Sequence, residues 1–397
     1  MIAAVIGKNF GDEGKGLATD HFCAQVPFCC VVKHNGGAQA GHTVVHHGRR
    51  AVFHQLSSGS FREASTYFAS TYYPDFFKLR EEIEDFGKNP GIYCSINTPL
   101  IYIDDVLINQ ALEAARGSAR HGSCGMGINE GDIRTAAGFG LYARDVFGTD
   151  AVTLAGKMAE IREEYGMKRM LEAGLDKGDS EYMEMLSDKN VLINAAEEML
   201  HASECVTPVS DEPEFLHSQE NIVFESGQGL LLDSENELYA PHVTASRTGL
   251  HNVMLLLKTA GLKLDEACYV TRTYVTRHGA GSLPCECARD ALGRLGTDLT
   301  NIVNDWQGAI RYAAHVSVED FLAPVTADLR EAESLYPGAV RNTSLFITHL
   351  NETDSKIVFA DRRIDVRKFL SMPEVSGTFG RHYLSYSEGN ACHSCEQ

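Results

Sequence analysis

The sequence has few of the features that define several whole classes of protein. It contains no run of about 18 apolar residues, the length that a membrane-spanning helix requires. Lys and Arg number 35 against 54 Asp and Glu, and the net charge of −19 argues against a nucleic-acid-binding face. No basic segment precedes the first apolar run, so we expect no signal peptide, no membrane partner and a cytoplasmic location.

The sequence also lacks the cysteine pattern of a disulfide framework or a zinc site. Its 11 cysteines are odd in number and irregularly spaced, which is typical of reduced thiols in a cytosol. Cys392 and Cys395 have the spacing of half a zinc site, but no second pair has that spacing. A structural zinc ion is therefore disfavoured.

The patterns that are present predict an α/β fold. A chain of 397 residues with 44% hydrophobic content can bury a large core. Short apolar runs alternate with stretches of helical periodicity, which predicts a mostly parallel central β-sheet flanked by helices. We expect one domain over 1–397, with helical excursions around 75–120 and 150–205. The expected helices cover 75–87, 104–116, 152–173, 180–203, 249–261 and 307–316, and the expected strands cover 2–6, 28–32, 91–94, 100–103, 221–225, 267–275 and 344–348.

One group of charges within these helices is expected to face solvent. It lies between 157 and 164, has both signs, and includes Arg162. Mixed charges on an amphipathic helix are typical of an exposed face.

A glycine-rich turn follows the first apolar run, with the sequence Gly-Lys-Asn-Phe-Gly-Asp-Glu-Gly-Lys-Gly over 7–16. Its glycines allow backbone N–H groups to approach a phosphate closely, and Lys15 adds positive charge. Asp12 and Glu13 would repel phosphate unless a divalent cation or a proton-transfer task requires them. The turn is not a Walker A loop, because the glycine spacing differs and Gly16 stands where Ser or Thr would bind Mg²⁺.

Three further segments combine glycines with polar side chains. They are His-Asn-Gly-Gly-Ala-Gln-Ala-Gly-His-Thr over 34–43, Phe-Glu-Ser-Gly-Gln-Gly-Leu-Leu-Leu-Asp over 224–233, and Thr-Arg-His-Gly-Ala-Gly-Ser-Leu-Pro-Cys-Glu over 276–286. Together with the first turn they resemble, in family order, the GDEGKG, GGxxAGHT, FEGAQGxLLD and TRVGAGPFPTE signatures of the adenylosuccinate synthetase family. This resemblance spans most of the chain and implies the P-loop-NTPase-like fold of that family.

The resemblance implies a ligase of purine nucleotide biosynthesis that uses Mg²⁺ and GTP or ATP. Such an enzyme phosphorylates the 6-oxo group of a purine nucleotide, here most directly IMP, and an amine such as aspartate then displaces the phosphate. A lactam oxygen is a poor nucleophile until N1 loses its proton, so the reaction needs a carboxylate base. Asp12 matches that base and also a magnesium ligand, and the carbonyl of Gly41 matches the second ligand. His42 and Lys15 match the groups that stabilise the phosphoryl oxygens, and Gln228 matches the glutamine near the 6-position.

The same resemblance assigns residues that bind the two nucleotides. Ser123 and Cys124 stand in a loop similar to the GTTGRGIG segment that wraps the monophosphate, and Thr244 matches a threonine at the same group. Gln39 stands where the family has Asn. The full set of expected nucleotide-binding residues is Gly11, Glu13, Gly14, Gly16, Gln39, Ser123, Cys124, Thr244, Arg277, Thr348, Asn351, Ser387 and Gly389.

Two departures from the family concern substrate choice. The segment 297–306 aligns with the loop whose arginines hold the aspartate carboxylates, and it contains no arginine. Two lost carboxylate clamps would cost roughly 3–6 kcal/mol, or on the order of 10²–10⁴ in affinity. Either Arg272, Arg277 or Arg311 replaces them, or the amine donor is not aspartate. Asn351 replaces the guanine-reading Asp and suits adenine at least as well, because an amide offers one donor and one acceptor.

Other interpretations stay open at this point. Viral paralogues that act on a guanine nucleotide carry Ser in place of the catalytic Asp, so the retained Asp12 leans against a 2-amino purine acceptor. A non-catalytic nucleotide-binding paralogue and a phosphotransferase that stops at the phosphorylated nucleotide are the alternative functions. The expected partners are the nucleotide and amine substrates and a second copy in a homodimer, although the family's intersubunit Arg aligns with Gly138, near Arg134.

Overall fold

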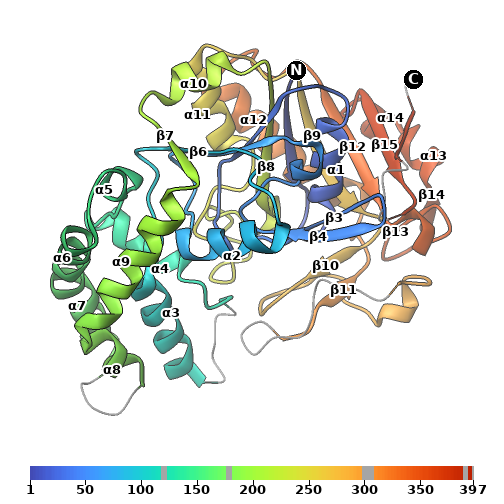
Figure 1. Ribbon diagram of the computed structural model, residues 1–397. Helices are drawn as coiled ribbons and strands as arrows, with labels where there is room; N and C mark the ends of the chain where they lie inside the picture. The colour runs from blue at the N-terminus through green and yellow to red at the C-terminus, as the bar shows by residue number, and fades with distance from the viewer. Residues whose placement is uncertain (118–122, 176–180, 297–307, 388–391, 396–397) are drawn as a thin grey trace.

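The computed structural model describes residues 1–117, 123–175, 181–296, 308–387 and 392–395. Its centre is a ten-stranded sheet in which every neighbouring pair is parallel except β15 and β16 (Figure 1). The expected α/β class with a mostly parallel sheet is therefore confirmed. The strand order is β16 (Cys392–Cys395), β15 (Arg381–Ser385), β12 (Thr343–Thr348), β9 (Glu266–Arg272), β1 (Ile2–Gly7), β8 (Asn221–Gly229), β2 (Cys29–Lys33), β5 (Ser65–Phe68), β6 (Ile92–Ser95) and β7 (Val206–Val209).

Helices and three small two-stranded antiparallel sheets surround this sheet. These small sheets are β3 (His42–His46) with β4 (Arg49–Phe53), β10 (Val275–Arg277) with β11 (Arg311–Ala313), and β13 (Lys356–Val358) with β14 (Arg363–Asp365). The α-helices are α1 (Lys15–Cys23), α2 (Phe76–Phe86), α3 (Ile103–Arg116), α4 (Ile128–Ala136), α5 (Ala143–Val146), α6 (Ala151–Ile161), α7 (Met167–Glu172), α8 (Glu181–Ser187), α9 (Lys189–Ser203), α10 (Glu212–Ser218), α11 (His251–Ala260), α12 (Val318–Leu335), α13 (Val366–Leu370) and α14 (Pro373–Ser376).

Strand β1 illustrates why an apolar run becomes a central strand here. It pairs with β8 on one side and β9 on the other, so both of its edges are occupied. Ala3 and Val5 join a buried cluster with side chains of α1, whereas Ala4 and Ile6 join a cluster with side chains of α11 and α12. Because successive strand residues point to opposite faces, a strand covered on both faces must be apolar throughout.

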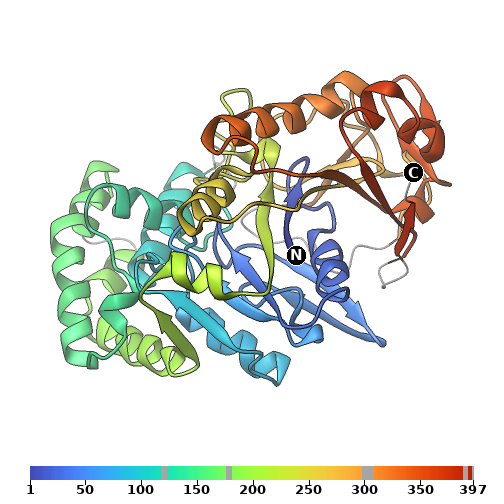
Figure 2. The same ribbon diagram turned by 90° about the horizontal axis from the view of Figure 1, so that it is seen from above.

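The helical excursions lie together in space. Figures 1 and 2 show α3 to α9 gathered at the β7 end of the sheet, and the C-terminal elements α13, α14 and β15 at the other end. None of the helices in the described part of the chain combines the length and the apolar character that a membrane crossing requires. The interpretation of 1–397 as one domain stays a prediction.

Several expected elements differ from those observed. The helix expected over 307–316 is wrong, because its described part holds the short strand β11, which pairs with β10. No strand forms over 100–103, where α3 already begins at Ile103. The strand expected over 267–275 is divided between β9 and β10, and the long helix α12 was not expected. Short apolar runs fit a strand or a helix turn equally well, and tertiary pairing decides between them.

The two long helices expected over 152–173 and 180–203 are each interrupted. A π-helical turn, η3 (Arg162–Gly166), separates α6 from α7, and Asp188 caps the start of α9 after α8 has ended. The expectation that Arg162 faces solvent is wrong. Its side chain is buried, with Nη2 2.6 Å from Asp104 Oδ1, because a carboxylate on α3 faces it.

Candidate functional site

The glycine-rich turn joins β1 to α1, and the side chain of Glu13 stabilises the turn through hydrogen bonds to its backbone. Gly11 and Gly14 have φ angles of 120° and 96°, a region that favours glycine. The Glu13 carboxylate accepts the N–H groups of Asn9 at 2.9 Å and Gly11 at 2.8 Å, and lies 3.0 Å from Lys15 Nζ. Burial opposes its charge, but Lys15 and these N–H groups outweigh burial and lower the pKa of Glu13. Glu13, expected at the nucleotide, therefore has its carboxylate turned into the turn.

His42 begins β3, and its imidazole is held by a carboxylate that sequence analysis missed. His42 Nδ1 lies 2.8 Å from Glu225 Oε1, and Lys33 Nζ lies 2.8 Å from Glu225 Oε2. The Ser58 hydroxyl donates to the same carboxylate. Although burial disfavours its charge, Lys33 and His42 lower the pKa of Glu225 well below its ordinary range. The signal that could have found Glu225 is a carboxylate inside an apolar strand, three residues before Gln228.

The Glu225 contact leaves the other imidazole nitrogen of His42 for chemistry. Burial lowers the pKa of His42, and Glu225 acts in the opposite direction. With Nδ1–H donating to the carboxylate, Nε2 of the neutral ring is available to accept a proton. Among the described residues, Nε2 is buried and has no hydrogen-bond partner. The arrangement can therefore move a proton at Nε2.

A cavity of about 420 Å³ brings the first two glycine-containing segments together. Asp12 and Lys15 line it from the first segment, and Gly41 and His42 line it from the second. The expected nucleotide-binding residues that also line it are Gly11, Gly14, Gly16, Thr348, Asn351 and Ser387.

Asp12 lies close to His278, and His278 lines a second cavity. The Asp12 Oδ2 atom lies 3.8 Å from His278 Nε2, and the Asp12 carbonyl accepts a hydrogen bond from Arg272 Nε. Burial raises the pKa of Asp12, with His278 and Arg272 acting in the opposite direction. A raised pKa makes the carboxylate a stronger base than an exposed aspartate. His278 was missed in the sequence, where it replaces the valine of the TRVGAG signature.

The second cavity, of about 230 Å³, collects buried polar atoms that lack partners. Among the described residues, Gln39 Oε1, Gln228 Oε1 and both ring nitrogens of His278 have no hydrogen-bond partner. An unpaired buried polar atom costs about 1–3 kcal/mol, so such a cluster indicates a polar ligand. A Cβ on Gly36 would lie 2.8 Å from Gln228 Oε1 and 3.2 Å from Gln39 Nε2, so glycine allows the two amides to converge. The expected site residues lining this cavity are Gln39, Ser123, Cys124, Gln228, Thr244 and Arg277.

The arginines considered as carboxylate clamps are largely engaged within the chain. Arg277 donates to the carbonyls of Ser282 at 2.6 Å and His242 at 2.7 Å. Arg311 donates to the carbonyls of Gly279 and Gly281 and pairs with a glutamate. Both guanidinium groups therefore support the loop after β10, which argues against their replacing an arginine clamp. The positions 297–306 and Gly389 lie outside the described residues.

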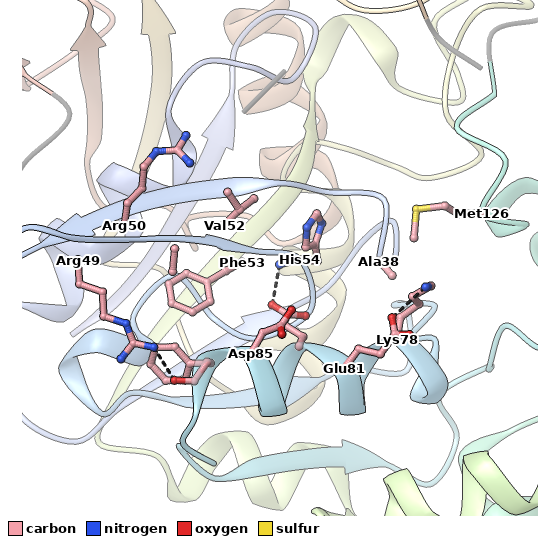
Figure 3. Close-up of a pocket in the computed structure, with 13 residues that line it drawn as sticks. Ala38, Arg49, Arg50, Val52, Phe53, His54, Lys78, Glu81, Asp85 and Met126 are labelled. Atoms are coloured by element: carbon pink, nitrogen blue, oxygen red, sulfur yellow. Dashed lines mark hydrogen bonds and ion pairs between the residues drawn. The ribbon is translucent and has the colours of Figure 1, made fainter. Parts of the chain in front are cut away.

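A larger cavity, of about 610 Å³, lies between the β3–β4 hairpin and α2 (Figure 3). Glu82 of α2 accepts the backbone N–H groups of His54 at 2.7 Å and Gln55 at 2.8 Å. His54 Nδ1 in turn lies 2.6 Å from the carbonyl oxygen of Ala40, next to Gly41. None of the expected catalytic residues is among the described residues that line this cavity. Its walls support the hairpin that carries His42.

These features place the protein in the class of α/β proteins that build polar sites from loops at the carboxyl ends of parallel strands. A profile of the adenylosuccinate synthetase family matches residues 4–307. The chain therefore belongs to the adenylosuccinate synthetase family. It is 31% identical over 292 residues to the adenylosuccinate synthetase of Alcanivorax borkumensis, a match that covers 71% of this chain and 64% of that relative.

Two solved structures share the fold. The fully ligated adenylosuccinate synthetase from Plasmodium falciparum has a TM-score of 0.71 at 15% identity, with 98% of each chain covered. The succinoaminodeoxyadenylate synthetase PurZ of cyanophage S-2L, bound to dGMP and to dATP as an energy donor, has a TM-score of 0.62 at 16% identity, with 99% of this chain and 94% of that chain covered. At these identities the likeness concerns the fold. It extends to the C-terminal strands and turns, which lie beyond the match to the family profile.

Proposed function

We propose that this chain is a ligase that phosphorylates the 6-oxo group of IMP and then replaces the phosphate with an amine. The observation that carries the proposal is that Asp12 and His42, from two separate glycine-containing segments, line one cavity together with Lys15. Asp12 removes the N1 proton, because burial raises its pKa towards that of an effective base. His42 Nε2 handles the proton at the phosphoryl oxygen, and Lys15 offsets the charge of the transferring group.

The acceptor nucleotide fits the second cavity. Gln228 and Gln39 present amide groups for the purine edge, and Ser123 and Thr244 present hydroxyls for the monophosphate. His278 lies between this cavity and Asp12, so the purine ring reaches the base from this side. The triphosphate occupies the first cavity, with its base towards Asn351 and Ser387.

Magnesium fits the oxygen ligands that line the first cavity. Asp12 and Gly41, whose carboxylate and carbonyl would hold the ion, both line it. In the described ranges no three His, Cys, Asp or Glu side chains form a metal cage. This agrees with an ion that takes one carboxylate and completes its shell with phosphate oxygens and water. When bound, Mg²⁺ neutralises developing charge on the phosphates.

The phosphate donor and the amine are the finer parts of the proposal. Asn351 at the base end of the cavity favours ATP at least as much as GTP. Arg277 and Arg311 use their Nη donors on main-chain carbonyls, which argues against both as clamps for the second carboxylate of aspartate. Arg272 lines the first cavity and stays the candidate clamp. Aspartate stays the first amine to test, and an amine with fewer carboxylates is the second.

Turnover assays with a full substrate matrix test the proposal. The protein is incubated with Mg²⁺, IMP or dGMP, and ATP or GTP, with and without aspartate, and phosphate release and product mass are recorded. Asp12→Asn is expected to abolish phosphate release, whereas Asp361→Asn, at a carboxylate that is 71% exposed, serves as the matched control. If none of the combinations releases phosphate, the proposal is contradicted.

The product mass separates the alternatives. Phosphorylated IMP that persists in the presence of every amine identifies a phosphotransferase, and turnover with dGMP alone identifies a guanine nucleotide acceptor. Nucleotide binding without turnover identifies a non-catalytic paralogue.

We also propose that the protein is a homodimer, as the family resemblance implies, and that it is cytoplasmic, as its irregular cysteine pattern indicates. Arg134, considered near the dimer contact, is buried and bonded to Asp105 at 2.7 Å, so another residue must reach across such an interface. Light scattering on the purified protein tests the assembly.

A further inference from the structure

Glu352 links three parts of the first cavity. It ends the short 3-10 helix η6 (Leu350–Glu352) and follows Asn351, the residue proposed to read the base of the triphosphate. Its Oε1 atom accepts the N–H of Gly296 at 2.9 Å, and its Oε2 atom accepts the hydroxyl of Tyr274 at 2.6 Å. Both carboxylate oxygens therefore accept hydrogen bonds, one from Gly296 and one from Tyr274.

The Tyr274 contact continues to the main chain of Asp12, the proposed base. Tyr274 is almost fully buried, and its hydroxyl accepts a hydrogen bond from Arg272 Nη1 at 3.2 Å. Arg272 Nε donates to the main-chain carbonyl of Asp12. A continuous set of side-chain hydrogen bonds therefore runs from Glu352 through Tyr274 and Arg272 to Asp12.

The Gly296 contact continues to the segment that precedes 297–307. The backbone N–H of Arg294 donates to the main-chain carbonyl of Glu352 at 2.8 Å, so two bonds fix this segment to one residue. The stretch that follows Gly296 aligns with the amine-donor loop of the family. Tyr274, Gly296, Asn351 and Glu352 all line the cavity of about 420 Å³.

We propose that Glu352 is a positioning residue that couples the triphosphate site to Asp12 and to the segment leading into the amine-donor loop. The proposal rests on the proposed function, because it takes this cavity as the triphosphate site. A base bound at Asn351 fixes η6, and the two oxygens of Glu352 then fix Tyr274 on one side and Gly296 on the other. The contacts of Glu352 with Tyr274 and with Gly296 both need the same rotamer of the Glu352 side chain. Fixing that rotamer therefore orders Tyr274 and Gly296 together through charge-assisted hydrogen bonds.

Two variants separate the contact of Glu352 with Tyr274 from its contact with Gly296. Glu352→Ala removes both side-chain contacts, whereas Tyr274→Phe removes only the contact that leads to Arg272 and Asp12. Tyr269→Phe is the matched control, since the Tyr269 hydroxyl also donates to a buried carboxylate, Asp328 at 2.8 Å, but in the core away from this cavity. It reproduces the loss of one tyrosine–carboxylate bond without touching Glu352.

The first measurement is the coupling between the two nucleotide sites. The affinity for a non-hydrolysable ATP or GTP analogue with Mg²⁺ is measured by calorimetry with and without saturating IMP. The wild type and Tyr269→Phe are expected to show a coupling of at least about fivefold, within the usual range for linked sites. Glu352→Ala and Tyr274→Phe are expected to reduce this factor to about one. Full coupling in both variants, or binding of both nucleotides by the wild type without coupling, overturns the inference.

The second measurement needs no ligand. Amide hydrogen exchange at Gly296 is expected to quicken by about tenfold or more in Glu352→Ala, because its acceptor is lost. The amide of Arg294 is the internal reference, since its acceptor is the main chain of Glu352. Unchanged exchange at Gly296 overturns the inference. Failure of the wild type to bind either nucleotide would instead count against the proposed function, so the two failures are distinct.

Discussion

Two buried networks of carboxylates and cations lie in different parts of the protein. One is in the central sheet, where Glu225 meets Lys33 and His42. The other is among the helices at the β7 end, where Asp104 meets Arg162. In the helical network, Arg162 donates from Nε and Nη2 to Asp104 and from Nη1 to the carbonyl of Asp188. In the sheet network, His42 Nε2 has no partner among the described residues. Both networks are therefore buried and charged. The unpartnered Nε2 of His42 distinguishes the network of the functional site from the structural network around Arg162.

The pKa shifts of the two carboxylates also differ in direction. Burial raises the pKa of Asp104, although Arg162 opposes that rise. The pKa of Glu225 falls despite burial, because Lys33 and His42 both act on it. With the Lys33 ammonium and the His42 N–H both at its oxygens, Glu225 stays charged, and a charged Glu225 orients the imidazole.

Between the two networks, the largest effect is expected for His42→Ala. Loss of a proton-transfer group lowers turnover by about 10²–10⁴-fold, while the melting temperature changes little. Steady-state kinetics and thermal unfolding measure the two quantities. His46→Ala, four residues along the same strand, is the control and keeps turnover. If His42→Ala lowers the melting temperature strongly and keeps turnover, the sheet network is structural and the proposed distinction between the two networks is wrong.

Arg162→Met tests the helical network and is expected to lower the free energy of unfolding by about 3–5 kcal/mol, because Asp104 is left buried and unpaired. Denaturant titration measures the loss, and turnover per folded molecule stays unchanged. The double variant Asp104→Asn with Arg162→Met is expected to recover most of the stability, because no unpaired charge remains. A double variant as unstable as the single one contradicts this account.

Glu225→Gln sharpens the comparison by removing charge while keeping shape. The loss of a charge-assisted hydrogen bond, about 1.5–3 kcal/mol, predicts a fall in turnover of roughly 10–100-fold. The expected loss is smaller than that of His42→Ala, and a double variant is expected to be no worse than His42→Ala alone. Additive losses would show that Glu225 does not act through His42.

The smallest expected effect is the change in local stability when the pH is lowered. Glu225 has a lowered pKa in the folded state, so its contribution to stability is present above its ordinary value of 4.5 and is lost as the pH falls below it. Asp104 has a raised pKa, so its contribution changes in the opposite sense and improves as the pH falls. Between pH 6 and pH 4 the local opening free energy, obtained from amide exchange after correction for the intrinsic exchange rate at each pH, is therefore expected to fall around β8 by about 1 kcal/mol and not to fall around α3. A fall around α3 with none around β8 would contradict the assigned directions.

Local signals were sufficient for some elements. Helix α2 was expected over 75–87, and it runs from Phe76 to Phe86, with the Asp75 side chain capping its start and Gly87 at a φ of 74° ending it. The motifs also identified Asp12 and His42, which share a cavity. In these cases the determinant lies within a few residues of the element.

The missed features have determinants far away in the sequence. Arg162 bonds to a carboxylate 58 positions away, and His42 bonds to one 183 positions away, so neither partner appears in a local window. Strand β11 replaces an expected helix because β10 supplies a pairing edge. His278 gave only a weak signal, a single substitution inside a motif, and its proximity to Asp12 emerges from the fold.

The strand order has a consequence for the timing of synthesis. The first strand, β1, has its partners in β8, which starts at Asn221, and in β9, which starts at Glu266. At about 5–20 residues per second, a ribosome needs on the order of 10–40 s before the earlier of these partners even exists. Through that interval β1 is an apolar segment with both edges unpaired, so a chaperone that binds extended apolar segments is expected to hold this stretch until β8 and β9 pair with it.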